Sequence, residues 1–134
     1  MIELTLSKIK VDEKRHEQLV VFREVGGKRF LPLVIGLPEI QAIKMKLGGV
    51  KTPRPMTHDL ILSVVAGLGG KFQKIVIDKL ENNTFHAKIH LLKEDGAETA
   101  IDARPSDSVA IALRAQVPVF VEEAVLDKAS VYEV

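Results

Sequence analysis

The fold is decided by a junction between a strand and a helix at residues 101–107, which read IDARPSD. Ser106 is a good N-cap for the helix, which continues with apolar residues on one face. Residues 33–39 read LVIGLPE and align with this stretch so that Asp107 falls on Glu39. In both stretches a proline and a carboxylate occupy the expected first turn, where proline is tolerated and a negative charge meets the helix dipole. The two junctions predict an internal duplication.

Three strands are expected before each junction. We expect them at about residues 2–11, 19–22 and 30–35 in the first half, and at about 72–80, 84–92 and up to 102 in the second. Glycine and asparagine reach the positive φ of tight turns, so Gly26-Gly27 and Asn82-Asn83 predict hairpins. A charged turn is expected at residues 12–17, and the change of apolar phase after Leu6 predicts a β-bulge.

These elements predict the α+β fold class. We expect one domain over residues 1–134 in which a strand–strand–strand–helix unit occurs twice, at about 1–68 and 71–130. The sheet is expected to be mostly antiparallel or mixed, with the helices packed on it. A short strand at about 117–121 and a helix at about 122–130 complete the second half.

Two helices are expected in the first half. One runs from Pro38 to Gly48-Gly49, with an apolar face formed by Ile40, Ile43 and Leu47. The other, from Thr57 to about Leu68, is unusual because it is apolar on nearly every side. Such a helix is either fully buried or shared with another subunit, so a homodimer is expected.

The composition is that of an ordinary globular domain, with 46% hydrophobic and 28% charged residues in a chain of 134. The absence of cysteine excludes disulfides, thiolate zinc sites and cysteine nucleophiles, and it is compatible with a cytoplasmic location. The N-terminus does not resemble a signal peptide. The longest uncharged stretch, residues 60–70, is shorter than the roughly 20 residues that a membrane span needs. We therefore expect a cytoplasmic protein without a membrane contact.

The first candidate cluster of functional residues is the segment 51–59, which reads KTPRPMTHD. Thr57 as N-cap and Asp59 in the first turn of the helix have a structural explanation. His58 gains nothing from that position, since histidine brings no advantage in capping. It can be a general acid or base, a metal ligand or a surface residue.

The second candidate cluster is the junction at residues 102–107. Capping by Ser106 and the helix dipole at Asp107 explain two of its polar residues, which leaves Asp102 and Arg104. If Asp102 lies near Asp107 or Asp59, their oxygens could hold magnesium or manganese. If Arg104 lies between them, the result is a salt-bridged structural cluster. The sequence leaves both alternatives open.

A basic strip precedes His58. There is no acidic residue from Ile40 to His58, whereas Lys44, Lys46, Lys51 and Arg54 are all basic. Such a strip suits a partner that carries phosphate groups. A solvated helix face followed by a loop is the other explanation. With a net charge of +1, the chain as a whole has no general attraction for nucleic acid.

The sequence resembles the bifunctional nuclease family at residues 54–60 (RPMTHDL) and 102–107 (DARPSD), and also at residues 34–36 (VIG) with Glu39 and Ala42-Ile43. The matches follow the family's order and spacing, and the similarity runs from the N-terminal strand to about Leu126. Some members carry an additional C-terminal basic or coiled segment, and no partner contact of that kind is expected here. The resemblance implies an α+β fold with an internal repeat, dimer formation, and nuclease activity on DNA and RNA as reported for plant members.

The leading hypothesis is a phosphodiesterase that acts on DNA or RNA. In it, His58 relays a proton, three carboxylates hold a divalent cation or orient water, and basic and hydroxyl side chains contact the substrate. The carboxylates are Asp59, Asp102 and Asp107, and together with His58 and Arg104 they are the candidate catalytic residues. The substrate contacts are Lys51, Arg54, Thr57 and Ser106, and Arg54 or Arg104 steadies the phosphate. The alternatives are a non-catalytic homo-oligomeric binding or regulatory module, and nucleic-acid binding without cleavage.

Overall fold

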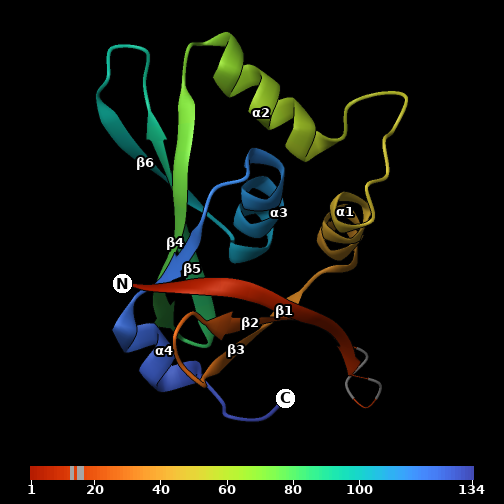
Figure 1. Cartoon of the computed structure of the whole chain (residues 1–134), viewed down its shortest axis with the longest axis vertical. Coiled ribbons are helices and arrows are strands. Elements are labelled where there is room, and N and C mark those ends of the chain that lie inside the picture. Colours follow the sequence, from red (N-terminus) through yellow and green to blue (C-terminus); the bar gives the residue numbers. More distant parts are fainter. Residues whose placement is uncertain (13, 15–16) are drawn as a thin grey trace.

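The computed structural model describes residues 1–12, 14 and 17–134, so the charged turn expected at 12–17 lies largely outside the described residues. These residues form one seven-stranded mixed sheet, in the order β3-β2-β1-β7-β4-β5-β6, together with four helices (Figure 1). The α+β class and the mixed sheet are confirmed.

The strands are β1 (Ile2–Asp12), β2 (Glu17–Glu24), β3 (Phe30–Ile35), β4 (Lys71–Glu81), β5 (Thr84–Leu92), β6 (Glu98–Ala103) and β7 (Val119–Val121). Among the described residues, five of the six strand pairings are antiparallel, and β4 and β7 run parallel. The register of β1 against β2 shifts between Leu6 and Lys8, which confirms the predicted bulge.

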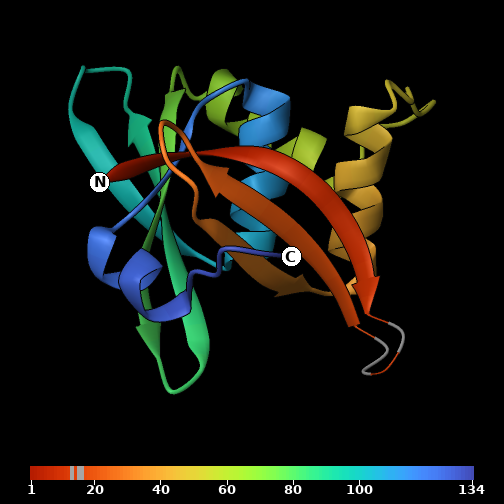
Figure 2. The same ribbon diagram turned by 60° about the horizontal axis from the view of Figure 1, so that its bottom comes forward.

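The helices are α1 (Leu37–Leu47), α2 (Thr57–Gly67), α3 (Pro105–Ala115) and α4 (Glu123–Ala129). The first three gather on one side of the sheet, with α3 in contact with both α1 and α2, and α4 lies apart from them (Figures 1 and 2). In the described part of the chain, no helix has the length and apolar character needed to cross a membrane.

The core occupies both faces of the central strands. Three consecutive residues are buried in β2 (20–22) and again in β4 (75–77), although neighbouring side chains on a strand point to opposite faces. Both faces are therefore covered at these positions. Ile40 and Ile43 of α1 join this core as expected, but the prediction for Leu47 is wrong, because its side chain is 52% exposed at the end of the helix.

The tight turns form where the sequence predicts them. Gly26 between β2 and β3 has a φ of 81°, and Asn82 and Asn83 between β4 and β5 have φ values of 52° and 59°. These left-handed conformations suit glycine and asparagine, and two of them in succession match the right-handed twist of a hairpin.

Two helices begin differently from the prediction. The residue that precedes α2 is Met56, whose N–H donates to Asp59 Oδ2 at 3.1 Å, so Thr57 is already inside the helix. The residue that precedes α3 is Arg104, because Pro105 with its fixed φ begins the helix, and Ser106 follows inside it. The predictions that Thr57 and Ser106 are N-caps are therefore wrong.

The order strand, strand, strand, helix occurs in both halves. After it the halves differ, since α1 is followed by α2, whereas α3 is followed by β7 and α4. The order of elements agrees with the predicted repeat, but a duplication of the chain stays a prediction.

Helix α2 is not fully buried, and that alternative is wrong. His58 is the one buried residue among those described in this helix, whereas Leu60 and Val64 are 55% and 53% exposed. Leu68, which follows the last residue of the helix, is 73% exposed. Contact with a second subunit remains the other alternative.

Arg29 joins the β2–β3 hairpin to α4. Its guanidinium lies 3.0 Å from Glu24 Oε1, 3.1 Å from Glu123 Oε1 and 2.9 Å from Asp127 Oδ1. The hydrogen bonds from Arg29 lower the pKa of Glu24 below its ordinary value. The Glu24 carboxylate is therefore more favourable in the folded than in the unfolded chain.

Glu24→Gln should lower the thermal midpoint at neutral pH. Because the pKa of Glu24 is lowered on folding, its contribution is present above the ordinary value of 4.5 and is lost as the pH falls through the lowered value. The difference in midpoint between the variant and the wild type should therefore shrink below pH 4.5. Thermal unfolding followed by circular dichroism from pH 7 to pH 3 measures it, with the exposed Glu81→Gln as control. A difference that stays constant over this range would contradict the role given to Glu24.

Candidate active site

The two polar clusters meet where α2 and α3 begin. His58 Nε2 lies 3.0 Å from Asp107 Oδ1, although the two residues are 49 positions apart in the chain. The His58 side chain is 10% exposed and that of Asp107 is 31% exposed. Both side chains therefore lie close to the surface, with the imidazole the better shielded of the two.

Asp107 also contacts Arg104. Its Oδ2 accepts a hydrogen bond from Arg104 Nε at 2.9 Å and lies 2.8 Å from Arg104 Nη2. The same Nη2 donates a hydrogen bond to Glu39 Oε1 at 2.9 Å. Asp107, and to a smaller extent Glu39, raises the pKa of Arg104, so the guanidinium of Arg104 stays charged. A continuous chain of contacts from His58 through Asp107 and Arg104 to Glu39 thus connects the beginnings of three helices.

Asp107 determines the tautomer of His58. A carboxylate only accepts hydrogen bonds, so the neutral imidazole presents its N–H at Nε2 to Asp107. This leaves the lone pair on Nδ1 to accept a proton. A histidine oriented by a carboxylate in this way is the arrangement that many general bases use.

These residues line a cavity of about 590 Å³. Isoleucines from α2, β5, β6 and α3 provide apolar walls. The polar side chains come from the end of β6 and from the beginnings of the three helices: Glu39, Thr57, His58, Asp102, Arg104 and Asp107. A shielded histidine beside apolar walls and a carboxylate can carry out proton transfer in such a cavity.

Asp59 does not join this cavity. Its Oδ1 lies 2.9 Å from Nε of Arg114, and its Oδ2 accepts the Met56 N–H. The Arg114 side chain is only 5% exposed and donates further hydrogen bonds, both of 3.2 Å, to the carbonyls of Ala42 and Ala110. Asp59 is therefore part of a link between α1, α2 and α3, rather than of the His58 cluster.

Asp102 lines the His58 cavity but contacts a different cation. Its side chain is 75% exposed and lies 3.3 Å from Lys88 Nζ, which is also 3.5 Å from Asp78. Burial disfavours the charged form of Lys88 and by itself would lower the pKa of this ammonium group. The hydrogen bond to Asp102 and the charge of Asp78 outweigh the effect of burial, so the pKa of Lys88 is raised.

The carboxylates predicted as metal ligands are thus engaged by three different cations: Arg114 at Asp59, Lys88 at Asp102 and Arg104 at Asp107. Within residues 1–12, 14 and 17–134, no three side chains of the metal-binding types come together. In the described residues, the donor set around His58 therefore does not fit a magnesium or manganese ion.

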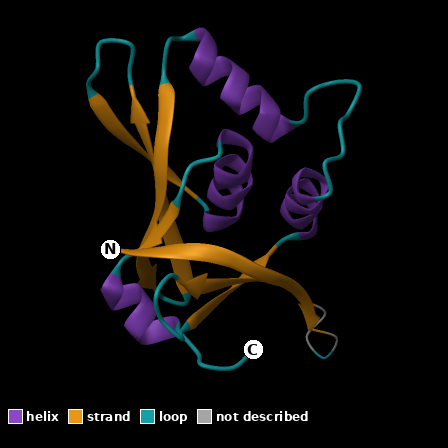
Figure 3. Ribbon diagram, in the orientation of Figure 1, coloured by secondary structure: helices purple, strands orange, loops and turns teal. Residues whose placement is uncertain are grey.

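The predicted substrate contacts are dispersed. Lys51 and Arg54 are exposed in the loop 48–56 between α1 and α2, teal in Figure 3, and Lys51 lines a second cavity next to Asp59. Thr57 lines the His58 cavity, whereas Ser106 lines another pocket, between β3 and the β4–β5 turn.

Sequence reasoning missed Glu39 and Arg114 as members of these networks. The alignment of Glu39 with Asp107 was a usable signal, because the two carboxylates share Arg104. For Arg114, the signal was a cation in the otherwise small and apolar residues 109–115 of a helix.

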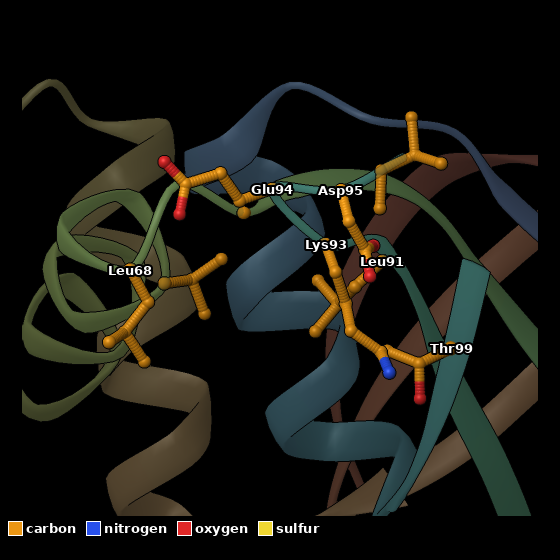
Figure 4. A pocket seen from close by; sticks show the side chains of 9 residues that line it. Leu68, Leu91, Lys93, Glu94, Asp95 and Thr99 are labelled. Carbon is orange, nitrogen blue, oxygen red and sulfur yellow. The ribbon is translucent and has the colours of Figure 1, made fainter. Parts of the chain in front are cut away.

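A further cavity of about 550 Å³ lies at the far end of α2, between its last turn and the β5–β6 hairpin. Leu68 and Leu91 contribute apolar side chains to it, and Lys93, Glu94 and Asp95 come from the hairpin (Figure 4). It has apolar walls but none of the residues of the His58 cluster.

Comparison with known proteins assigns the chain to a family. Residues 20–133 match the model of the bifunctional nuclease domain. An uncharacterised protein of Mycobacterium tuberculosis, found in two strains, is 42% identical over 129 residues, which cover 96% of this chain and 76% of the relative.

Plant relatives are more distant. Bifunctional nuclease 1 of rice (Oryza sativa subsp. japonica) is 23% identical over 116 residues, which cover 85% of this chain and 35% of the relative. Bifunctional nuclease 1 of Arabidopsis thaliana is 24% identical over 115 residues, or 84% of this chain and 35% of the relative. The chain thus corresponds to about a third of each plant protein. With the domain match over most of its length, the resemblance inferred from the motifs is confirmed, and the chain belongs to the bifunctional nuclease domain family.

Proposed function

We propose that this protein hydrolyses phosphodiester bonds in DNA or RNA, and that His58 and Asp107 perform the proton transfer. The observation that carries the proposal is the 3.0 Å contact between His58 Nε2 and Asp107 Oδ1 beside a cavity large enough for part of a nucleotide. Membership of the family and the printed names of the plant relatives support the same reaction class.

The reaction begins when His58 Nδ1 accepts a proton from a water molecule. The oxygen of that water attacks phosphorus and forms the new P–O bond, while the P–O bond to the leaving sugar oxygen breaks and this oxygen takes a proton from solvent. The imidazolium that forms at His58 is stabilised by Asp107 through Nε2, and it then releases its proton to solvent, which restores the neutral ring. Arg104, whose side chain is 68% exposed, binds the phosphoryl oxygens with those N–H groups that do not contact Asp107 or Glu39.

Cleavage of end-labelled DNA and RNA by wild-type protein, compared with the Asp107→Asn protein purified in parallel, tests this assignment. Activity in the wild type alone supports it. Equal activity in both preparations would identify a contaminating nuclease.

A second function, assembly with another copy of the chain, is favoured by the exposed apolar side of α2. Leu60 and Val64 are more than half exposed, and residues 60–70 carry no charge that would hinder close contact. Exposed apolar patches of this kind mark protein interfaces. In this proposal the apolar sides of two α2 helices cover each other.

Leu60→Glu combined with Val64→Glu should weaken such a dimer by about a hundredfold or more, because two buried apolar side chains are worth several kcal/mol. Sedimentation velocity over a range of micromolar concentrations measures the change. The control is Val25→Glu with Leu47→Glu, since these side chains are 53% and 52% exposed on other elements. A wild type that is already monomeric would contradict the proposal, as would equal weakening by the control pair.

A further inference from the structure

The charges around His58 are not enough to hold a nucleic-acid strand. The carboxylates of Glu39, Asp102 and Asp107 all line the His58 cavity, and Arg104 is the cation among its lining residues. Arg104 also shares its N–H groups between Glu39 and Asp107. Nucleic acid carries one negative charge per nucleotide, so the attraction for its backbone has to come from neighbouring cations.

A cavity in which basic lining residues outnumber acidic ones lies next to the His58 cavity. It has a volume of about 470 Å³ and lies between the end of α1, the loop 48–56 and the first turns of α2. Met56 lines both cavities, so they adjoin at the beginning of α2. Its basic residues are Lys46, Lys51 and Arg114, and the carboxylate among its lining residues is Asp59.

The charge of Asp59 is already compensated by the buried Arg114, at 2.9 Å. No ion pair of Lys46 or Lys51 occurs among the described residues, and both side chains are exposed. The two ammonium groups therefore give this cavity an excess of positive charge.

Lys46 is not needed as a donor to the end of α1. The carbonyl of residue 44 accepts a hydrogen bond from the N–H of residue 48 at 2.9 Å, and the carbonyl of residue 45 accepts one from residue 50 at 2.9 Å. The carbonyl of residue 46 accepts one from residue 49 at 3.2 Å. These bonds satisfy the groups that a lysine near a helix C-terminus would otherwise contact. Its ammonium group can therefore bind an external anion.

We propose that this second cavity binds a backbone phosphate of the substrate, next to the phosphodiester that reacts at His58. Lys46 and Lys51 contact that phosphate, and the strand crosses the beginning of α2 at Met56. The inference rests on the proposed nuclease function, because it assigns where the neighbouring part of the same strand lies.

The three methionines provide a test. Met45 and Met56 line the second cavity, whereas Met1 is 58% exposed at the N-terminus. Protein labelled with ¹³C in the methionine methyl groups is titrated with a single-stranded thymidine octanucleotide in low salt. The Asp107→Asn protein serves for this titration so that the probe stays intact. The signals of Met45 and Met56 should shift, and that of Met1 should not.

Lys46→Ala combined with Lys51→Ala should abolish the shift of Met45 and leave a shift of Met56. It should also reduce the slope of log affinity against log salt by about 0.7, since the proposed site neutralises one phosphate and each phosphate contact to a single strand contributes about that much. The control is Lys79→Ala with Lys128→Ala, which removes the same charge from exposed positions on β4 and α4.

Two results would overturn the inference. One is a Met45 signal that does not shift in the protein that retains Lys46 and Lys51. The other is that the two double variants change the Met45 shift and the salt dependence of binding equally. The binding result is independent of cleavage. If the wild type binds through Lys46 and Lys51 but cleaves neither DNA nor RNA, the phosphate site stands and the proposed nuclease function falls.

Discussion

Replacing Asp107 by asparagine is expected to reduce the rate of phosphodiester cleavage by about two to four orders of magnitude. The carboxylate accepts the Nε2 hydrogen of His58 at 3.0 Å and stabilises the imidazolium that forms when Nδ1 takes a proton. An amide can rotate to present its NH₂ group to the ring, and it carries no negative charge. The side chain keeps nearly the same size, so the fold should persist.

His58→Ala should cause a loss of similar size, and the double variant should lose little more than either single one. Groups that act as a unit are non-additive, because removing one already disables the other. Single-turnover cleavage of a fluorescent oligonucleotide with each protein in excess measures all three rates.

Asp102→Asn is the matched control for this experiment. Asp102 lines the same cavity but is 75% exposed and contacts Lys88 instead of His58. The cleavage rate of this variant should stay within about threefold of the wild type, an effect of about 0.7 kcal/mol or less. A loss in Asp102→Asn as large as in Asp107→Asn would refute the assignment of the proton transfer to His58 and Asp107.

Asp59→Ala is expected to lower the free energy of unfolding by about 2–4 kcal/mol. The substitution leaves the Arg114 guanidinium, only 5% exposed, without its carboxylate, and it removes the acceptor of the Met56 N–H. The value lies below that of a fully buried pair because the Asp59 side chain is itself 41% exposed.

Adding Arg114→Met to Asp59→Ala should restore part of this stability. Replacing Arg114 removes the unpaired guanidinium charge and, with it, the free-energy cost of keeping that charge away from water. Methionine retains much of the apolar volume of the arginine side chain. Urea unfolding, analysed by linear extrapolation, gives the free energies. The exposed Glu81→Ala should change stability by no more than about 0.5 kcal/mol. If the double variant is less stable than Asp59→Ala, the buried charge is not the source of the loss.

Local features of the sequence predicted most of the fold. Gly26, Asn82 and Asn83 determine their turns through their own backbone preferences, so the neighbouring chain was enough to place them. The helix starts were shifted by one or two residues, because the choice of first residue depends on details such as the Asp59 contact to Met56.

The candidate site could be predicted only in part. The polar residues of the two clusters were identified from the sequence, but their pairing depends on how α2 and α3 pack against each other. Spacing along the chain does not reveal that His58 meets Asp107 while its neighbour Asp59 meets Arg114. Consecutive residues on a helix point about 100° apart, so one helix start contributes to two cavities.

The position of β7 in the sheet has a consequence for biosynthesis. The strands of the first half, β3-β2-β1, and those of the second, β4-β5-β6, are joined edge to edge by β7 alone, whose residue Val121 pairs with Ile2. As the chain leaves the ribosome, the two halves can form hairpins, but their two half-sheets cannot be joined edge to edge until residues 119–121 have emerged. Contacts between such distant positions are slow to form. We expect a nascent chain that ends before residue 119 to remain two unjoined half-sheets with open edges, and therefore to aggregate readily.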